Sequence, residues 1–254
     1  MNSNFKINIL TTDGPQYDYL IHKLEDYFTV NIVIRELGKS QRKILLRKKK
    51  FYRYLCNRYQ WLVRKVLGYD KYRKQYFYFE QPLNSKIINV PNINSENVIY
   101  LINQYPCNLY IVMGTSILKA PLLESCNADI INIHGGYLPD YRGNNCIYFA
   151  YQNNDFDKIA NTIHFIDKGI DTGDIIKIVK PSILKKDNPE TLYCKAKKQA
   201  IHQLLGIIRN YQNGTPIPRY PQNIGIGKQY KTEERNPKTA ILFWVRRHLG
   251  RKRN

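Results

Sequence analysis

Two side chains that can take part in acid–base or oxyanion chemistry interrupt an apolar run. The stretch IINIHGGYLPDYRG, residues 130–143, carries Asn132 and His134 two residues apart. Because successive side chains of a strand point to opposite faces, Asn132 and His134 are expected on the same face. They would meet at the end of the strand, where open α/β sheets place their chemistry. The alternative is a buried Asn–His pair that only hydrogen-bonds in the core.

The residues that follow favour a site over a core pair. Gly135 and Gly136 leave the backbone open to close approach, and residues 141–145 offer hydrogen-bond donors. Asp171 lies further along the chain in the turn-rich loop KGIDTGD. An Asn, a His and an Asp that converge could supply an oxyanion donor, a group that holds or passes a proton, and a carboxylate that charges the imidazole. This chemistry requires no metal.

Alternating strands and helices are predicted to position these residues. Strands are expected at 6–11, 29–35, 86–90, 109–113 and 129–134, and helices at 16–28, 95–104 and 116–124. This alternation predicts an α/β, Rossmann-like fold with a mostly parallel sheet and helices on both faces. Two more strands are expected within 162–181. A long helix then follows, with Asp187 or Asn188 as its cap and Pro189 in its first turn.

Charge and composition limit the functional classes. The net charge of +20 gathers in two segments: residues 39–80 hold fourteen Lys or Arg, and the chain from Lys228 holds nine. Such an excess indicates a polyanionic partner or a substrate with phosphates. Five scattered cysteines without a CxxC pair disfavour a zinc or redox site. We expect a cytoplasmic protein, because neither a signal peptide nor an apolar run of spanning length is present.

The combined motifs resemble those of the folate-dependent formyltransferases. That family includes glycinamide ribonucleotide formyltransferase, methionyl-tRNA formyltransferase and the sugar N-formyltransferases of bacterial surface polysaccharides. The resemblance covers residues 86–235 and rests on NIHGGYLPDYRG and TIHFIDKGIDTGDII, flanked by VMGTSILKAPLLE and PETLYCKAKKQAIHQLLGIIRNYQNGTPIPRYPQ. One departure is that the family commonly has a Ser shortly after the His, where this chain has Gly135 and Gly136.

The resemblance implies a catalytic triad of Asn132, His134 and Asp171. The implied reaction is transfer of a formyl group from 10-formyltetrahydrofolate to an amine, through a tetrahedral intermediate whose oxygen is negatively charged. Asn132 and protonated His134 would stabilise that oxygen. Asp171 would raise the pKa of His134 and accept a proton from the amine, directly or through water.

The resemblance also implies which residues bind the two substrates. The folate would contact Met113, Gly114, Thr115, Ile117, Leu118, Ile170, Thr172, Gly173 and Asp174. The acceptor would bind beside Tyr141, Arg142, Gly143 and Asn144. We expect His164 to pack in the interior, with a place in the site as the weaker alternative.

Three classes of acceptor are considered. The favoured acceptor is a nucleotide-linked amino (dideoxy) sugar, whose diphosphate would suit basic side chains near the cleft. Methionyl-tRNA suits the charge, but the C-terminal β-barrel of those enzymes needs more residues than follow Tyr230. Glycinamide ribonucleotide is disfavoured because the first strand ends in TTDGP instead of a Gly-rich phosphate loop. A fourth hypothesis is a non-catalytic nucleic-acid or membrane binder on the same fold.

The predicted organisation has three parts: a catalytic domain of residues 1–38 and 81–235, a basic helical insertion of residues 39–80, and a short C-terminal extension of residues 236–254. In that extension Ile241, Leu242, Trp244, Val245 and Leu249 share one broad helical face, flanked and followed by basic residues. Such a helix could lie on the inner face of an anionic membrane or dock on residues 45–67. Nucleic acid is not an expected partner, and a homodimer is left open.

Overall fold

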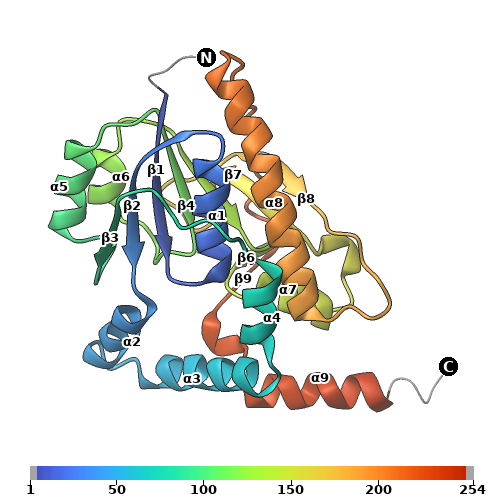
Figure 1. Cartoon of the computed structure of the whole chain (residues 1–254). Coiled ribbons are helices and arrows are strands. Elements are labelled where there is room, and N and C mark those ends of the chain that lie inside the picture. Colours follow the sequence, from blue (N-terminus) through green and yellow to red (C-terminus); the bar gives the residue numbers. More distant parts are fainter. Residues whose placement is uncertain (1–4, 250–254) are drawn as a thin grey trace.

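A seven-stranded sheet organises the chain (Figure 1). The computed structural model describes residues 5–249. The strand order is β3-β2-β1-β4-β5-β7-β8. Its strands are β1 (Lys6–Thr12), β2 (Thr29–Glu36), β3 (Ile87–Val90), β4 (Leu109–Met113), β5 (Ile130–His134), β7 (Asn161–Phe165) and β8 (Ile175–Val179). The first five run parallel, whereas β7 is antiparallel to both β5 and β8. The mostly parallel α/β sheet predicted from the sequence is confirmed.

Helices cover both faces of this sheet. Helices α1 (Pro15–Glu25) and α8 (Pro189–Gln212) pack on one face, and α5 (Glu96–Gln104) and α6 (Ala120–Ser125) pack on the other (Figure 1). Smaller elements are β6 (Tyr141–Gly143), α7 (Cys146–Gln152), η1 (Phe156–Lys158), β9 (Lys228–Tyr230) and η2 (Thr232–Glu234). The predicted cap of the long helix is confirmed at Asn188, whose side chain accepts hydrogen bonds from the backbone N–H groups of residues 190 and 191.

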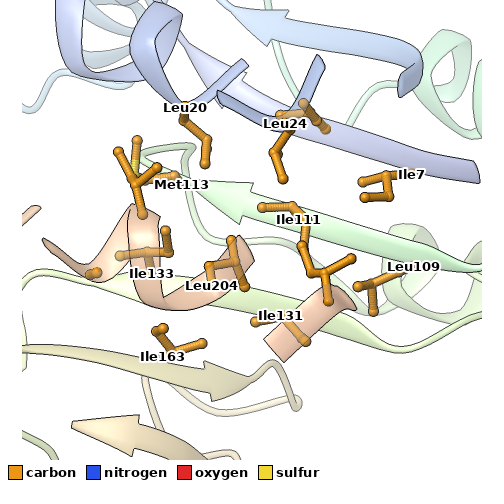
Figure 2. Close-up of a cluster of buried hydrophobic side chains, with 14 of the residues drawn as sticks. Ile7, Leu20, Leu24, Leu109, Ile111, Met113, Ile131, Ile133, Ile163 and Leu204 are labelled. Atoms are coloured by element: carbon orange, nitrogen blue, oxygen red, sulfur yellow. The ribbon is translucent and has the colours of Figure 1, made fainter. Parts of the chain in front are cut away.

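The core explains which way the polar residues of β5 face. Ile131 and Ile133 join the cluster beneath α1 and α8, beside Leu204 of α8 (Figure 2). Because side chains alternate along a strand, Asn132 and His134 leave β5 from the opposite face. They lie at its carboxyl end, which is also the end of the neighbouring strand β4. The apolar alternation therefore fixes the direction of both polar groups.

Residues 38–76 form α2 (Gly38–Arg47), α3 (Phe51–Val66) and α4 (Tyr69–Tyr76) at the carboxyl edge of the sheet, where α9 (Pro237–Leu249) also lies (Figure 1). The side-chain amide of Gln60 in α3 donates to the carbonyls of Thr232 and Arg235, each at 2.9 Å. The segment before α9 is thereby held on α3. That residues 39–80 are an insertion into a catalytic domain, and that 236–254 are a separate extension, stay predictions.

The structure describes three side chains of the predicted apolar face of the tail: Ile241 and Leu242 are 63% and 46% exposed, and Val245 is partly buried. Phe243, which is not part of that predicted face, packs edge-on against Tyr151, with the ring centroids 6.1 Å apart. The side chains of Trp244 and Leu249, and residues 250–254, lie outside the described part of the structure. In the described residues, no helix is long and apolar enough to cross a bilayer.

Helix α6 is shorter than predicted, because long-range contacts hold the residues before it. The sequence predicts a helix over 116–124, but α6 begins at Ala120. The backbone N–H of Ser116 donates to Glu36 at 2.8 Å, and the side chain of Asn94 bonds both the carbonyl of Ile117 and the N–H of Lys119. These contacts keep residues 114–119 as a loop beside the end of β4.

Replacing Glu36 by Gln should loosen this loop. The buried carboxylate accepts hydrogen bonds from the N–H groups of Ile93 (3.1 Å) and Ser116 (2.8 Å) and from the side chain of Gln41 (2.8 Å). In Glu36→Gln an N–H₂ group replaces one acceptor oxygen, so we expect a loss of about 1–3 kcal/mol in the free energy of unfolding, measured by urea titration. The exposed carboxylate variant Glu124→Gln is the control. Equal stability of the two variants would contradict this role of Glu36.

Candidate active site

Strand register brings a second histidine to the polar end of β5. Strands β5 and β7 pair antiparallel, with Asn132 opposite His164 and His134 opposite Thr162. Directly opposed residues project from the same face of a sheet. The side-chain nitrogen of Asn132 accordingly lies 3.0 Å from Nε2 of His164. His164 is buried, as expected, and its contact with Asn132 also places it beside the site, which was the weaker alternative.

Asp171 reaches the same place from the loop between β7 and β8. Its Oδ1 lies 3.3 Å from His134 Nδ1 and 3.7 Å from His164 Nε2. Its Oδ2 accepts a 2.8 Å hydrogen bond from the backbone N–H of Gly143. The backbone of Asp171 is left-handed, with φ of 55°, and Gly173 follows where a Cβ would lie 2.1 Å from the carbonyl oxygen of Phe165. The tight loop aims the carboxylate at the two imidazoles.

Both ring nitrogens of His134 have partners. Nδ1 faces Asp171, and Nε2 lies 2.9 Å from the carbonyl oxygen of Tyr141. Since a carbonyl only accepts, Nε2 carries a proton. Burial alone would lower the pKa of His134, but the negative charge and hydrogen bond of Asp171 outweigh it, so the pKa is raised well above its usual value. For Asp171, burial would raise the pKa, but His134 holds it below its usual value. The pair is ionised at neutral pH.

His164 is neutral at neutral pH, in contrast to His134. Burial lowers its pKa to about 4, and the positive charge of His134 adds to that effect while Asp171 opposes it. Nδ1 lies 2.7 Å from the carbonyl oxygen of Phe165, so in the neutral ring Nδ1 donates and Nε2 accepts. The group that donates to Nε2 is the Asn132 amide nitrogen. His164 thus orients Asn132 and leaves its second amide hydrogen free to meet a ligand.

Gly136 lies where any side chain would collide with the site. A Cβ at this position would lie 2.6 Å from each of three atoms: His134 Nε2, the Tyr141 carbonyl oxygen and the Cys146 Cβ. Such distances are far inside van der Waals contact. The close packing of backbone around the imidazole therefore requires glycine at residue 136.

A cleft of about 1250 Å³ opens over these side chains. The cleft is lined by Asn132, His134 and Asp171, by residues 112–118, and by Gly143, Asn144, Ile166, Asp167 and Ile170. The structure thus gathers the predicted triad with most of the residues predicted to bind folate, and with two of the four residues predicted to bind the acceptor.

Other predicted site residues lie outside the lining. Thr172, Gly173 and Asp174 form the turn behind Asp171 and do not line the cleft. The Tyr141 ring is buried against Tyr230 at 5.4 Å, so Tyr141 meets the site only through its carbonyl. Arg142 does not line the cleft either, and its Nε is buried without a hydrogen-bond partner among the described residues. Direct substrate contact by these residues stays a prediction.

Sequence reasoning missed a group of residues that lines one part of the cleft. This part is built by α3, α4, α8 and the segment before α9, through Arg53, Asn57, Arg64, Arg73, Glu190, Tyr193, Lys197 and Arg235. The only available signal was the density of basic residues in 39–80 and after Lys228. That signal indicates positive charge but not the direction in which each side chain points.

Comparison with known proteins identifies the family of the chain. The model of the formyl transferase family matches residues 71–208, more than half of the chain, and the chain belongs to that family. A methionyl-tRNA formyltransferase of Methylacidiphilum infernorum is 31% identical over 156 residues, which are 61% of this chain and 48% of the relative. The chain therefore spans about half the length of that curated relative.

Two solved structures share the fold. A 4-N formyltransferase from Francisella tularensis has a TM-score of 0.58 and 21% identity, over 89% of this chain and 76% of the other. An N-formyltransferase from Helicobacter canadensis, in complex with folinic acid and dTDP-3-aminofucose, has a TM-score of 0.56 and 19% identity, over 88% and 70%. At these identities the likeness concerns the fold.

The pKa values of the two histidines should be shifted in opposite directions, upward for His134 and downward for His164. By NMR we expect His134 to stay protonated well above the ordinary value near 6.5, and His164 to be neutral until the pH falls to about 4. In Asp171→Asn the counter-charge is lost while burial remains, so the pKa of His134 should fall below its ordinary value. His202 lies outside the cleft, and its pKa is lowered by partial burial and by the charges of Lys198 and Lys23, so its titration should be the same in the wild type and in Asp171→Asn. An unchanged His134 titration in Asp171→Asn would contradict the ion pair.

Proposed function

We propose that this protein transfers a formyl group from 10-formyltetrahydrofolate to the amine of a nucleotide-linked amino sugar. The observation that carries the proposal is the convergence of Asn132, His134 and Asp171 at the floor of one cleft. Family membership supports the formyl transfer, and the structural neighbour that holds dTDP-3-aminofucose supports the acceptor class. Synthesis of a bacterial surface polysaccharide is the role we propose for the product.

The residues of the cleft fit a folate. A pterin is a flat ring that needs apolar contact on its faces and hydrogen-bonding groups around its edge. The loop after β4 offers Ile117, which is 61% exposed, and Leu118, with the backbone of Gly114 and Thr115 beside them. Ile166 and Ile170 lie on the other wall. When bound, 10-formyltetrahydrofolate would supply an electrophilic formyl carbon.

The triad supplies complementary charge and orientation. Asn132 has an amide hydrogen free to donate to an oxygen that becomes negative, and the cationic His134 stabilises negative charge nearby. Contact between His134 Nε2 and a ligand requires that the ring exchange the Tyr141 carbonyl for it. The lowered pKa of Asp171 makes this carboxylate a weak base, which favours its role in holding His134 charged. The proton that the attacking amine loses would pass to Asp171 directly or through a water.

The turn after β1 disfavours glycinamide ribonucleotide as the acceptor. Asp13 occupies this turn and its carboxylate accepts a 2.6 Å hydrogen bond from the N–H of Gly38. The ring of Tyr17 packs so closely against Gly114 that a Cβ there would lie 2.4 Å away. A carboxylate and a packed aromatic ring would oppose a phosphate group at this position.

The triad variants should lose turnover while keeping the fold. We expect His134→Ala and Asn132→Ala each to lower turnover by about 10²- to 10⁴-fold, as removal of an oxyanion stabiliser does. The assay follows formylation of nucleotide-linked 3-amino and 4-amino dideoxy sugars by mass spectrometry, with 10-formyltetrahydrofolate as donor. His202→Ala, an exposed histidine outside the cleft, is the control and should keep wild-type turnover.

Two outcomes would contradict the proposal. Near-wild-type turnover in either triad variant would contradict the assigned residues. Formylation of methionyl-tRNA or glycinamide ribonucleotide in preference to every amino sugar of the panel would contradict the acceptor class. Release of formate without any amine would instead identify a hydrolase.

For its location we propose the cytoplasm, with peripheral contact to an anionic membrane through α9. Ile241 and Leu242 are exposed, and α3 carries exposed Leu55 and Leu62 beside basic residues. We expect weak cosedimentation with phosphatidylglycerol vesicles that disappears at high salt, because screening weakens attraction between exposed charges. The double substitution Ile241→Ser, Leu242→Ser should abolish it. Absence of vesicle binding at low salt would reject this contact.

A further inference from the structure

Four cations from separate parts of the chain meet on the wall of the cleft formed by α3, α4, α8 and the segment before α9. They are Arg64 in α3, Arg73 in α4, Lys197 in α8 and Arg235 just before α9. None of them belongs to the triad or to the loops proposed to hold the folate. The sequence places them far apart, so only the fold produces this concentration of positive charge.

Lys197 is the most unusual member, because its charge is buried with little compensation. Its side chain is 4% exposed, and its ammonium group has one long hydrogen bond of 3.4 Å, to the carbonyl oxygen of Ile133. That carbonyl lies between Asn132 and His134 in β5, so the ammonium is next to the triad. Burial, followed by the charge of Arg73, lowers the pKa of Lys197 to about 7, so its charged form is only partly populated at neutral pH and an entering anion would favour it. A buried ammonium with one weak acceptor costs stability.

The three arginines differ in how their charges are compensated. Arg73 makes a bidentate ion pair with Glu190, and Arg64 lies 3.3 Å from Asp70. Arg235 donates to the side chain of Asn145 at 3.1 Å and stacks over Tyr148 at 4.2 Å. Burial lowers the pKa of Arg235, and the charges of Arg64 and Arg73 lower it further. Among the described residues, neither Lys197 nor Arg235 forms an ion pair with a carboxylate.

Lys197 and Arg235, which have no carboxylate partner among the described residues, favour the entry of an anion, and Arg64 and Arg73 lie beside them although each is paired with a carboxylate. Guanidinium groups bind phosphate oxygens through paired, charge-assisted hydrogen bonds, and these are stronger than neutral ones. The side chains of Arg73 and Lys197 are recessed, so the diphosphate of a small ligand that enters the cleft can reach them, whereas a polynucleotide backbone on the surface does not. A compact phosphate or diphosphate group therefore matches the geometry.

We infer that Arg64, Arg73, Lys197 and Arg235 form the binding site for the diphosphate of the acceptor. This inference rests on the proposed function for its choice of ligand. The loops after β4 and β7 and the side chains of the triad line the same cleft as the four basic residues. A nucleoside diphosphate held by the four cations would present its attached sugar to Asn132 and His134 while the folate binds across from it.

Calorimetry with inorganic pyrophosphate and with dTDP tests the site without any formyl transfer. The full chain should bind both anions, and affinity should fall with ionic strength. Lys197→Met and Arg235→Gln should each weaken dTDP binding by about tenfold or more, since each removes a charge-assisted hydrogen bond. The control Arg58→Gln removes one charge from α3 at an exposed position outside the cleft and should change affinity by less than about twofold.

Thermal unfolding separates a binding role of Lys197 from a structural one. Because Lys197→Met replaces a poorly compensated buried charge, its Tm without ligand should be equal to or above that of the wild type, while dTDP affinity is lost. A lower Tm with dTDP affinity retained would overturn the inference in favour of a structural lysine. Lys197→Arg should retain part of the affinity, because it keeps the charge.

The outcomes distinguish this inference from the proposed function. Loss of dTDP binding in both variants supports the site even if no amino sugar is formylated. Wild-type affinity in both variants overturns the site while formyl transfer by the triad can still be measured. No detectable binding of either anion to the wild type at low salt also overturns it. Binding of pyrophosphate and dTDP with equal affinity would restrict recognition to the phosphate groups, as the four cations imply.

Discussion

The ion pair between His134 and Asp171 joins two segments that the sequence separates, the end of β5 and the loop between β7 and β8. Removing both charges from water is unfavourable, and their attraction offsets that cost only if the remaining hydrogen-bonding groups are satisfied. The N–H of Gly143 and the carbonyl of Tyr141 satisfy them. The left-handed backbone at Asp171, the strand β6 and the packing of glycines around the imidazole are therefore all conditions for one buried pair.

Much of the fold could be predicted from local pattern. The central strands β1, β4 and β5 are largely buried on both faces and read as short apolar runs, and β1 and β5 lie within one residue of their predicted bounds. The start of α8 could be predicted because Asn188 and Pro189 are both typical of helix starts. The start of α6 could not, since Glu36 and Asn94, distant in sequence, hold the preceding loop through hydrogen bonds.

The site was predictable only in part, for a related reason. Strand alternation places Asn132 and His134 on one face, but nothing local shows that Asp171 turns towards them, and that step came from the family resemblance. The role of His164 depends on the register between β5 and β7, which is a pairing of distant residues. The cluster of Arg64, Arg73, Lys197 and Arg235 depends on the docking of residues 232–235 onto α3 through Gln60. The sequence shows the density of basic residues, but it does not show where their side chains lie relative to the triad.

Because Gly136 has no side chain, three neighbouring groups can pack closely around it. The three atoms that exclude a Cβ belong to the catalytic imidazole, to the backbone of β6 and to the start of α7. A serine at this position requires that His134, Tyr141 and Cys146 all move first. Any side chain added at Gly136 would therefore disturb the imidazole, the backbone of β6 and the start of α7 together.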